Sequence, residues 1–290
     1  MLGVLLIDKP LGCTSHDVVD DVRRRFHTRR VGHAGTLDPL ATGLLVVAVG
    51  PATRFLQYLP LEPKEYMAEI TFGRTTTTFD REGETVSQAL APTDIRKAVE
   101  AALPQFLGLI KQTPPMFSAV KVEGKALYKY ARSGEEVDRA ARNVHIGAFD
   151  ILDAEDNRIK ARIVCSGGTY IRTLAHDMGR ALGCGAYLSG LHRTKVGRFE
   201  VGQAVPLDQA SPERLIPLEE ALDPMPMVLL TLPQTISVRE GRQIGMPDII
   251  DAPLVALIGP ENGVFSVARV HGNLLQPECV IPSEAMHGVV

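Results

Sequence analysis

The segment from Ile159 to Gly183 constrains the fold most, because a strand, a tight turn and a helix follow one another without a gap. Apolar and polar residues alternate over 159–165, which is the period of a half-buried strand. Gly167-Gly168 turns the chain, and apolar side chains then recur over 171–182 at helical spacing until the glycine that ends the helix. We interpret Thr169 as the N-terminal cap. This arrangement predicts a sheet with a helix packed on it.

The other predicted elements follow no regular order along the chain. The strands that we expect, besides 159–165, are 44–49 and 66–72, and residues 3–7 form a short apolar run. Besides 171–182, we expect three helices. One has Ser15 as its N-cap, and the others span 94–103 and 213–222. Residues 32–43 are expected to form a glycine-rich loop, and residues 121–142 a mobile polar excursion with helical pieces. Because no βαβ rhythm appears, the fold class that we predict is α+β with a mixed sheet.

Length and composition limit the organisation of the protein. The 290 residues suffice for one large and one small domain, and the proline-rich stretch 223–226 resembles a linker. We therefore expect domains over 1–225 and 226–290, the second β-rich. The N-terminus lacks a signal-peptide pattern, and the longest apolar run, 44–49, is too short to cross a bilayer. The four cysteines show no CxxC pairing, so we expect a cytoplasmic protein with free thiols and no membrane contact.

The charge distribution is uneven although the net charge is only −3. Residues 158–200 carry eight Lys or Arg and two Asp or Glu, whereas residues 201–290 carry four and eleven. A basic segment within an acidic chain favours a local surface that faces an anion. Chance clustering on a solvated face is the alternative.

One loop places a histidine and an aspartate close together in the sequence. His33 and Asp38 lie in the segment from Gly32 to Pro39. Pro39 disfavours the α region for the residue before it, so the Asp38 carboxylate is presented from extended backbone. The alternative is that Asp38 caps a helical turn that begins at Pro39. Taken alone, His33 is more typical of a loop hydrogen-bonder.

Arg172 occupies an unfavourable position. It lies in the first turn of its predicted helix, where a cation opposes the positive end of the macrodipole, and it falls off the apolar face. This indicates a partner outside the helix, for which a carboxylate would serve. The alternative is a solvated arginine, whose dipole cost is only about 0.5 kcal/mol. Tyr66 and Tyr170, without a ligand, are most simply core residues.

Familiar cofactor and nucleophile signatures are absent from the sequence. There is no GxGxxG after a strand, no Walker loop, no HExxH and no GxSxG. We therefore expect no nucleotide cofactor, no metal and no serine nucleophile. The chemistry must then depend on carboxylate, arginine, tyrosine and histidine side chains.

Several short motifs occur in order over about residues 3–200. They are KPLGCTS at 9–15, GHAGTLDPLATG at 32–43, GPATR at 50–54, KEY at 64–66, Gly73 with 75–80, Pro114-Pro115 with Ser118-Ala119, and CSGGTYIRTLAHDMG at 165–179. Their order and spacing resemble the TruB family of pseudouridine synthases, and the C-terminal part resembles a PUA domain. Two positions depart from the family: Gly167 stands where a lysine is usual, and Thr77 where an acidic residue is common.

The resemblance implies a mixed-sheet pseudouridine synthase catalytic domain with a small PUA-like C-terminal domain. It implies that the chain isomerises the uridine at position 55 of the tRNA T-loop, breaking N1–C1′, turning the uracil and rejoining it through C5. It assigns the essential carboxylate to Asp38, which attacks C1′ or takes a proton from C2′; both routes stay open. Because the formula does not change, no cofactor or metal is implied.

The resemblance also implies roles for other residues. Arg172 pairs with Asp38 and keeps it ionised by lowering its pKa. Tyr66 stacks on the target base and is a candidate for removing the C5 proton. His33 occupies stacking space while the base is flipped, and Leu191 forms an apolar wall of the uracil pocket. The other residues that we expect to bind substrate are Lys9, Gly32, Thr36, Asp80, Tyr170 and Arg193.

The partner that the resemblance implies is the T-arm stem-loop of tRNA, with no protein partner required. The arginine-rich end of the first helix, 121–142 and the surface of 158–200 then become phosphate contacts, which predicts strong salt dependence. The alternatives are a tRNA-folding chaperone that acts without catalysis, a guide-RNA-dependent relative and a uracil methyltransferase. The last is disfavoured because no cysteine lies in a candidate active loop and no cofactor fingerprint occurs.

Overall fold

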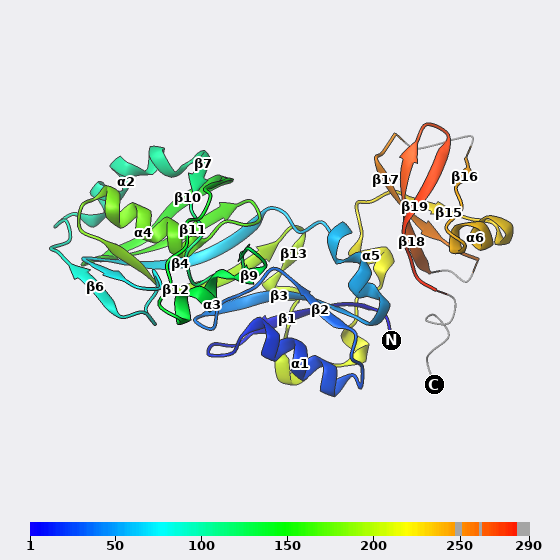
Figure 1. The fold of residues 1–290 in the computed structure, drawn as a ribbon, viewed down its shortest axis with the longest axis horizontal. Helices are drawn as coiled ribbons and strands as arrows, with labels where there is room; N and C mark the ends of the chain where they lie inside the picture. Colours follow the sequence, from blue (N-terminus) through cyan, green and yellow to red (C-terminus); the bar gives the residue numbers. More distant parts are fainter. Residues whose placement is uncertain (247–250, 261–262, 283–290) are drawn as a thin grey trace.

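The computed structural model describes residues 1–246, 251–260 and 263–282. Within these residues the chain forms a ten-stranded mixed sheet, a five-stranded sheet and two short hairpins. Figure 1 shows an elongated molecule with the large sheet and its helices at one end and the small C-terminal sheet at the other. The predicted α+β architecture, with a mixed sheet and a small β-rich C-terminal part, is confirmed.

The large sheet brings distant parts of the sequence side by side. In spatial order its main strands are β14 (Val205–Pro206), β1 (Gly3–Lys9), β3 (Ala41–Val49), β12 (Ala186–Val196), β4 (Lys64–Phe72), β11 (Arg158–Cys165), β10 (Arg142–Glu155) and β7 (Gly108–Gln112). β2 (Val31–Ala34) pairs with β3, and β13 (Phe199–Glu200) pairs with β12. The β1–β14 and β3–β12 pairs are parallel, whereas β4 is antiparallel to both of its neighbours.

Strands β1 and β3 are buried on both faces, which explains their uninterrupted apolar sequences. On one face Leu5 and Ile7 pack against α1 (Ser15–Arg25). On the other face Val4 and Leu6 join the cluster that contains the 3₁₀ helix η1 (Gly50–Tyr58). These strands therefore form a rigid platform at the edge of the functional site.

The other half of the sheet carries helices on one face. α2 (Ile95–Ala102), with η2 (Leu103–Phe106) after it, and α4 (Ile171–Ala181) bury their apolar sides against β4, β10, β11 and β12. Figure 1 shows α2 and α4 together above these strands. The strand–turn–helix predicted for 159–183 is present as β11 followed by α4.

Two helices begin differently from the prediction. Thr14, not Ser15, is the N-cap of α1, because its Oγ1 accepts from the Asp17 amide at 3.1 Å in a capping box. Tyr170, not Thr169, precedes α4, and the Thr169 hydroxyl donates to the Ser166 carbonyl at 2.9 Å. At α1 the adjacent hydroxyl residues leave the choice of cap ambiguous in the sequence, whereas the Tyr170 side chain does not cap α4.

Two further segments correct the sequence interpretation. Residues 32–43 are not one loop, since β2 and the start of β3 leave only 35–40 outside strands. Residues 213–222 are not one helix, because Pro217 separates η5 from α5. The short elements of this region are η3 (Val201–Gln203), η4 (Leu207–Gln209), η5 (Pro212–Arg214) and α5 (Leu218–Ala221).

Two hairpins extend from the large sheet. The first pairs β5 (Arg74–Thr76) with β6 (Thr85–Gln88), and the second pairs β8 (Lys121–Val122) with β9 (Lys125–Ala126). The second hairpin leads directly into α3 (Leu127–Arg132). The helical piece predicted within 121–142 is therefore confirmed, and this segment, with the residues from 113 onward, is called the insertion below.

The C-terminal sheet is curled and carries one helix. Its strands in spatial order are β15 (Met227–Leu229), β17 (Leu254–Ile258), β18 (Val264–His271), β19 (Leu274–Val280) and β16 (Ile244–Gly245), and its helix is α6 (Leu232–Arg239). Part of the region predicted to be β-rich, namely 247–250, 261–262 and 283–290, lies outside the described residues.

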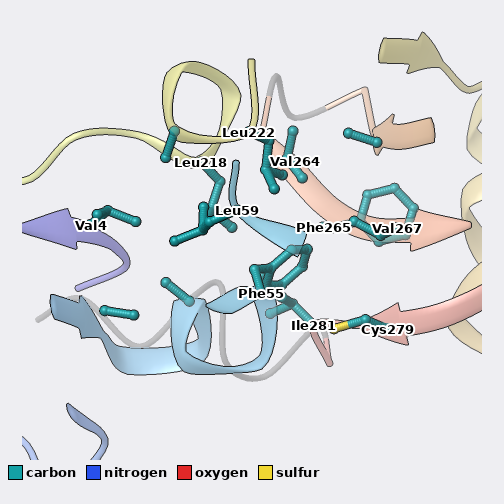
Figure 2. Close-up of a cluster of buried hydrophobic side chains, with 14 of the residues drawn as sticks. Val4, Phe55, Leu59, Leu218, Leu222, Val264, Phe265, Val267, Cys279 and Ile281 are labelled. Atoms are coloured by element: carbon teal, nitrogen blue, oxygen red, sulfur yellow. The ribbon is translucent and has the colours of Figure 1, made fainter. Parts of the chain in front are cut away.

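One hydrophobic core joins the two sheets. Figure 2 shows Phe55 of η1, and Leu59 just after that helix, beside Val264 and Phe265 of β18, with Ile281 at the edge of the cluster. All five side chains are 6% exposed or less. The residues between the sheets are therefore packed rather than simply tethered by the proline-rich stretch.

Phe55→Ala is expected to destabilise the protein by about 3–5 kcal/mol, because it opens a cavity in this shared core. Urea unfolding should show one cooperative transition that moves to lower denaturant. Leu90→Ala, at a side chain that is 96% exposed, is the control and should change stability by less than about 0.5 kcal/mol. Two separate transitions in the wild type would contradict the shared core.

Candidate active site

A cavity of about 230 Å³ opens where the loop 35–38, strands β4 and β12, the base of the insertion and the start of α4 meet. Seven residues that the sequence nominated line it together: Thr36, Asp38, Tyr66, Tyr170, Arg172, Leu191 and Arg193. They come from segments far apart in the chain, so the sheet order described above is what assembles the cavity.

The loop that carries Asp38 is fixed from several sides. The Ser15 hydroxyl accepts from the Leu37 amide at 2.8 Å and donates to the Leu37 carbonyl at 3.1 Å. The Gly12 amide donates to the Pro39 carbonyl at 2.9 Å. Residues after Asp38 form a turn that leads into β3, so the alternative that Asp38 caps a helix is wrong. The contacts that fix the loop come from Ser15 and Gly12, so the Asp38 carboxylate is not needed to stabilise it.

Arg172 is the centre of the polar network. Its side chain is 5% exposed, and Nε lies 2.9 Å from Asp38 Oδ2. Nη1 donates to the Thr78 carbonyl at 3.0 Å and Nη2 to the Phe117 carbonyl at 2.8 Å. The alternative of a solvated arginine is therefore wrong. These acceptors offset the unfavourable position of a cation at the start of α4.

Asp80 supports Arg172 from behind rather than lining the cavity. The Oδ2 atom of Asp80 lies 3.6 Å from Arg172 Nη1, and Asp80 as a whole is 4% exposed. Oδ1 accepts from the Thr78 hydroxyl at 2.5 Å and from the Glu82 amide at 3.0 Å. The neighbouring Phe79 ring stacks on His176 of α4 at 3.8 Å between centroids, which pins this turn to the helix.

Burial raises the pKa of the Asp38 carboxyl above its ordinary value, while Arg172 opposes this shift and Asp80 adds to it. The side chain is 37% exposed, and it faces the cavity. Arg172 lowers the pKa, as the sequence interpretation expects, but the loss of hydration on burial outweighs the ion pair.

Tyr66 and Leu191 form the apolar side of the cavity. In the sheet Tyr66 pairs with Arg193, and Leu191 pairs with Ala68. Tyr66 is 7% exposed, and burial raises the pKa of its hydroxyl although Arg193 opposes the shift. A phenol that is protonated at neutral pH suits stacking and hydrogen-bond donation better than proton removal, so a role at C5 stays a prediction.

Arg193 is a structural tie as well as a lining residue. It is 1% exposed, and its Nε donates to the Leu44 carbonyl at 2.7 Å. Its Nη2 donates to the carbonyl of Gly35 at 3.1 Å, which joins the Asp38 loop to β3 and β12. Gly35 has φ +82°, a conformation that favours glycine.

Besides Asp80, three residues that the sequence predicted for the site do not line this cavity. The Lys9 ammonium donates to the Pro10 and Cys13 carbonyls at 2.9 and 2.7 Å and so shapes the turn before α1. His33 and Gly32 lie in β2, and His33 Nδ1 is buried without a hydrogen-bond partner. Their contacts with substrate stay predictions.

Sequence reasoning missed three residues of the site. The Gln112 amide clamps the backbone of Tyr170, accepting from its N–H at 2.7 Å and donating to its carbonyl at 3.0 Å. Ser118 and Lys64 line the cavity, and the buried Ser118 hydroxyl has no hydrogen-bond partner. Lys64 could have been found, because it lies two residues before Tyr66 and so faces the same side of the strand.

The described residues contain no group of three or more His, Cys, Asp or Glu that could hold a metal ion. Their four cysteines are free. Over the same ranges, no helix has the length and apolar character that a membrane crossing requires.

Comparisons with a solved structure and with family models show the class of protein to which the chain belongs. The chain is similar to a solved structure of a Cbf5-Nop10-Gar1 complex, with a TM-score of 0.69 and 27% identity over 99% of this chain and 81% of that chain. A model of the TruB family pseudouridylate synthase N-terminal domain matches residues 23–171, and a tRNA pseudouridylate synthase B C-terminal domain matches 172–227. The fold is therefore that of a pseudouridine synthase.

Curated relatives extend over nearly the whole chain. The tRNA pseudouridine synthase B of Cupriavidus metallidurans is 43% identical over 96% of this chain and 94% of its own length. That of Thermobifida fusca is 44% identical over 96% of this chain and 98% of its own length. The chain belongs to the TruB family of pseudouridylate synthases and is an isomerase.

Proposed function

We propose that the protein converts the uridine at position 55 of the tRNA T-loop to pseudouridine, with Asp38 as the essential carboxylate and without a metal or cofactor. The observation that carries the proposal is the Asp38–Arg172 pair at 2.9 Å in a cavity whose other side is Tyr66 and Leu191. The names of the relatives supply the tRNA substrate.

The arrangement suits an intramolecular transfer. The target uridine is flipped out of the T-loop at a cost of about a few kcal/mol and enters with its base against Tyr66 and Leu191. Asp38 attacks C1′ or takes a proton from C2′ as the N1–C1′ bond breaks. The uracil turns and C5 bonds to C1′, as the bond between Asp38 and C1′ breaks on the first route or as Asp38 returns the proton to C2′ on the second. The C5 proton leaves to solvent, and N1 becomes protonated. Arg172 keeps the carboxylate oriented throughout.

The second part of the proposal concerns organisation. We place the boundary of the catalytic domain at 225 and that of the PUA-like domain at 226, where β15 begins the second sheet one residue later. The shared core described above holds this domain against the catalytic one, which supports a fixed orientation toward the rest of the tRNA.

The position of the product tests the proposal. Unmodified tRNA is incubated with the protein, digested, and analysed for pseudouridine by mass spectrometry. We expect a single pseudouridine at position 55, and none in a transcript that carries cytidine there. Pseudouridine at another position would overturn the assigned target.

The pH dependence of turnover follows from the environment of Asp38. The group must be ionised, and its pKa is raised above the ordinary value of about 3.9, so kcat/KM should begin to fall at a higher pH than that value predicts. Asp80→Asn removes a negative charge that raises this pKa, so the acid limb should move to lower pH. A limb that moves upward in Asp80→Asn would contradict the assignment.

A further inference from the structure

Four cations surround the cavity or its loop, and three of them are occupied by protein groups. Arg172 contacts two carboxylates and two carbonyls, Arg193 donates to two carbonyls, and Lys9 donates to two carbonyls. Lys64 lines the cavity, and among the described residues its side chain forms no hydrogen bond or ion pair. Of the three cations that line the cavity, namely Lys64, Arg172 and Arg193, it is the one left for a ligand.

The position of the Lys64 ammonium is defined by its glycine neighbours. Nζ would lie 3.1 Å from a Cβ built on Gly35 and 3.8 Å from one built on Gly167. The ammonium therefore sits between the Asp38 loop and the turn before α4, next to Tyr66 along β4. Glycines on both sides leave room for a nucleic-acid backbone to approach closely.

The surroundings of Lys64 disfavour its charge. Burial lowers the pKa of the ammonium, and the nearby Arg193 lowers it further. Glu62 acts in the opposite direction, but its carboxylate accepts the Gly167 amide at 3.0 Å instead of pairing with Lys64. A partly buried cation without a partner is unfavourable unless a ligand supplies an anion.

We propose that Lys64 binds a phosphodiester that adjoins the flipped uridine and thereby positions its ribose over Asp38. This rests on the proposed function. The base occupies the Tyr66 and Leu191 side, so the sugar–phosphate backbone must pass the neighbouring position on the strand, which is Lys64. A lysine suits this task because it binds phosphate as a point charge without demanding a fixed geometry.

The test uses Lys64→Met, which keeps the length of the side chain and removes its charge. We expect kcat/KM for tritium release from C5-tritiated tRNA to fall roughly tenfold to a hundredfold, mainly through KM. The slope of log kcat/KM against log salt should become shallower by about 0.7–0.9. Stability in urea should be unchanged or higher, because an unpaired partly buried cation is lost. Lys97→Ala, an exposed lysine on α2 outside the cavity, is the control.

A rescue variant makes the test specific to charge at this point. In Lys64→Met/Gly167→Lys a new ammonium can reach the same space, because the φ of Gly167 lies outside the left-handed region and only the flexible Glu62 carboxylate must move. We expect the salt slope and part of the affinity to return.

Other outcomes overturn the proposal in distinguishable ways. If the wild type turns over and Lys64→Met matches Lys97→Ala in KM and salt slope, the Lys64 assignment is wrong and the proposed function stands. If Lys64→Met loses kcat alone and the basic limb of its pH profile changes, Lys64 transfers a proton instead of binding phosphate. If the wild type itself releases no tritium, the proposed function fails.

Discussion

Asp38→Asn is expected to reduce tritium release from C5-tritiated tRNA by at least about a thousandfold while tRNA binding stays close to that of the wild type. The amide is nearly isosteric and can still accept from Arg172 Nε, so the network around the guanidinium persists. It can neither attack C1′ nor take a proton from C2′, and both proposed routes therefore stop.

The control for this variant is Asp156→Asn, the same substitution at an exposed turn residue with φ +53°, a conformation that asparagine tolerates. It should retain full activity. Binding is measured separately by filter retention or fluorescence anisotropy. Turnover by Asp38→Asn at the wild-type rate would show that another group acts on the ribose.

Arg172→Lys is expected to lower kcat by about a hundredfold or more and also to destabilise the fold. The guanidinium contacts Asp38, Asp80 and two backbone carbonyls at once, and a lysine cannot reproduce that fork. Each buried acceptor left unpaired costs about 1–3 kcal/mol. The positive charge of the new lysine keeps the pKa of Asp38 close to that of the wild type. It does not restore the orientation of the carboxylate.

The matched control is Arg162→Lys. Arg162 also joins two carboxylates, Glu65 and Asp150, but its side chain is 40% exposed and lies outside the cavity. Its replacement should change stability by less than about 1 kcal/mol and leave kcat unchanged. Equal effects of the two substitutions would mean that Arg172 acts only as a structural ion pair.

The fold was predictable where local pattern and tertiary packing agree. The alternation over 159–165 and the helical spacing after Gly168 gave β11 and α4 because both elements bury one face. β2 was missed because it is short and forms through pairing with β3, which no local pattern records. The cap of α1 was misplaced by one residue because Thr14 and Ser15 both carry hydroxyls, and that of α4 because the Thr169 hydroxyl donates back to the Ser166 carbonyl.

The site was predictable to a similar degree. The position of Arg172 at the wrong end of a helix dipole indicated an external partner, and the structure brings Asp38 to it. The raised pKa of Asp38 could not be foreseen, because it depends on how deeply the loop lies among β4, β12 and α4. Gln112 escaped notice since its function is to hold the backbone of Tyr170 across the sheet edge.

Asp38 and Arg172 are held in place by contacts from several parts of the fold. Ser15 of α1 and Arg193 of β12 hold the Asp38 loop, Arg193 also bonds to Leu44 of β3, and α4 supplies Arg172. The Phe117 carbonyl connects that arginine to the insertion. The geometry of the site thus depends on three segments that lie far apart in the sequence and meet around Arg172.

Release of tritium from C5-tritiated uridine in unmodified tRNA is the decisive measurement, made with the purified protein and no guide RNA or second protein. We expect release that approaches one tritium for each tRNA, from position 55. Binding of the tRNA without any release would contradict it, and would favour a protein that folds tRNA without modifying it.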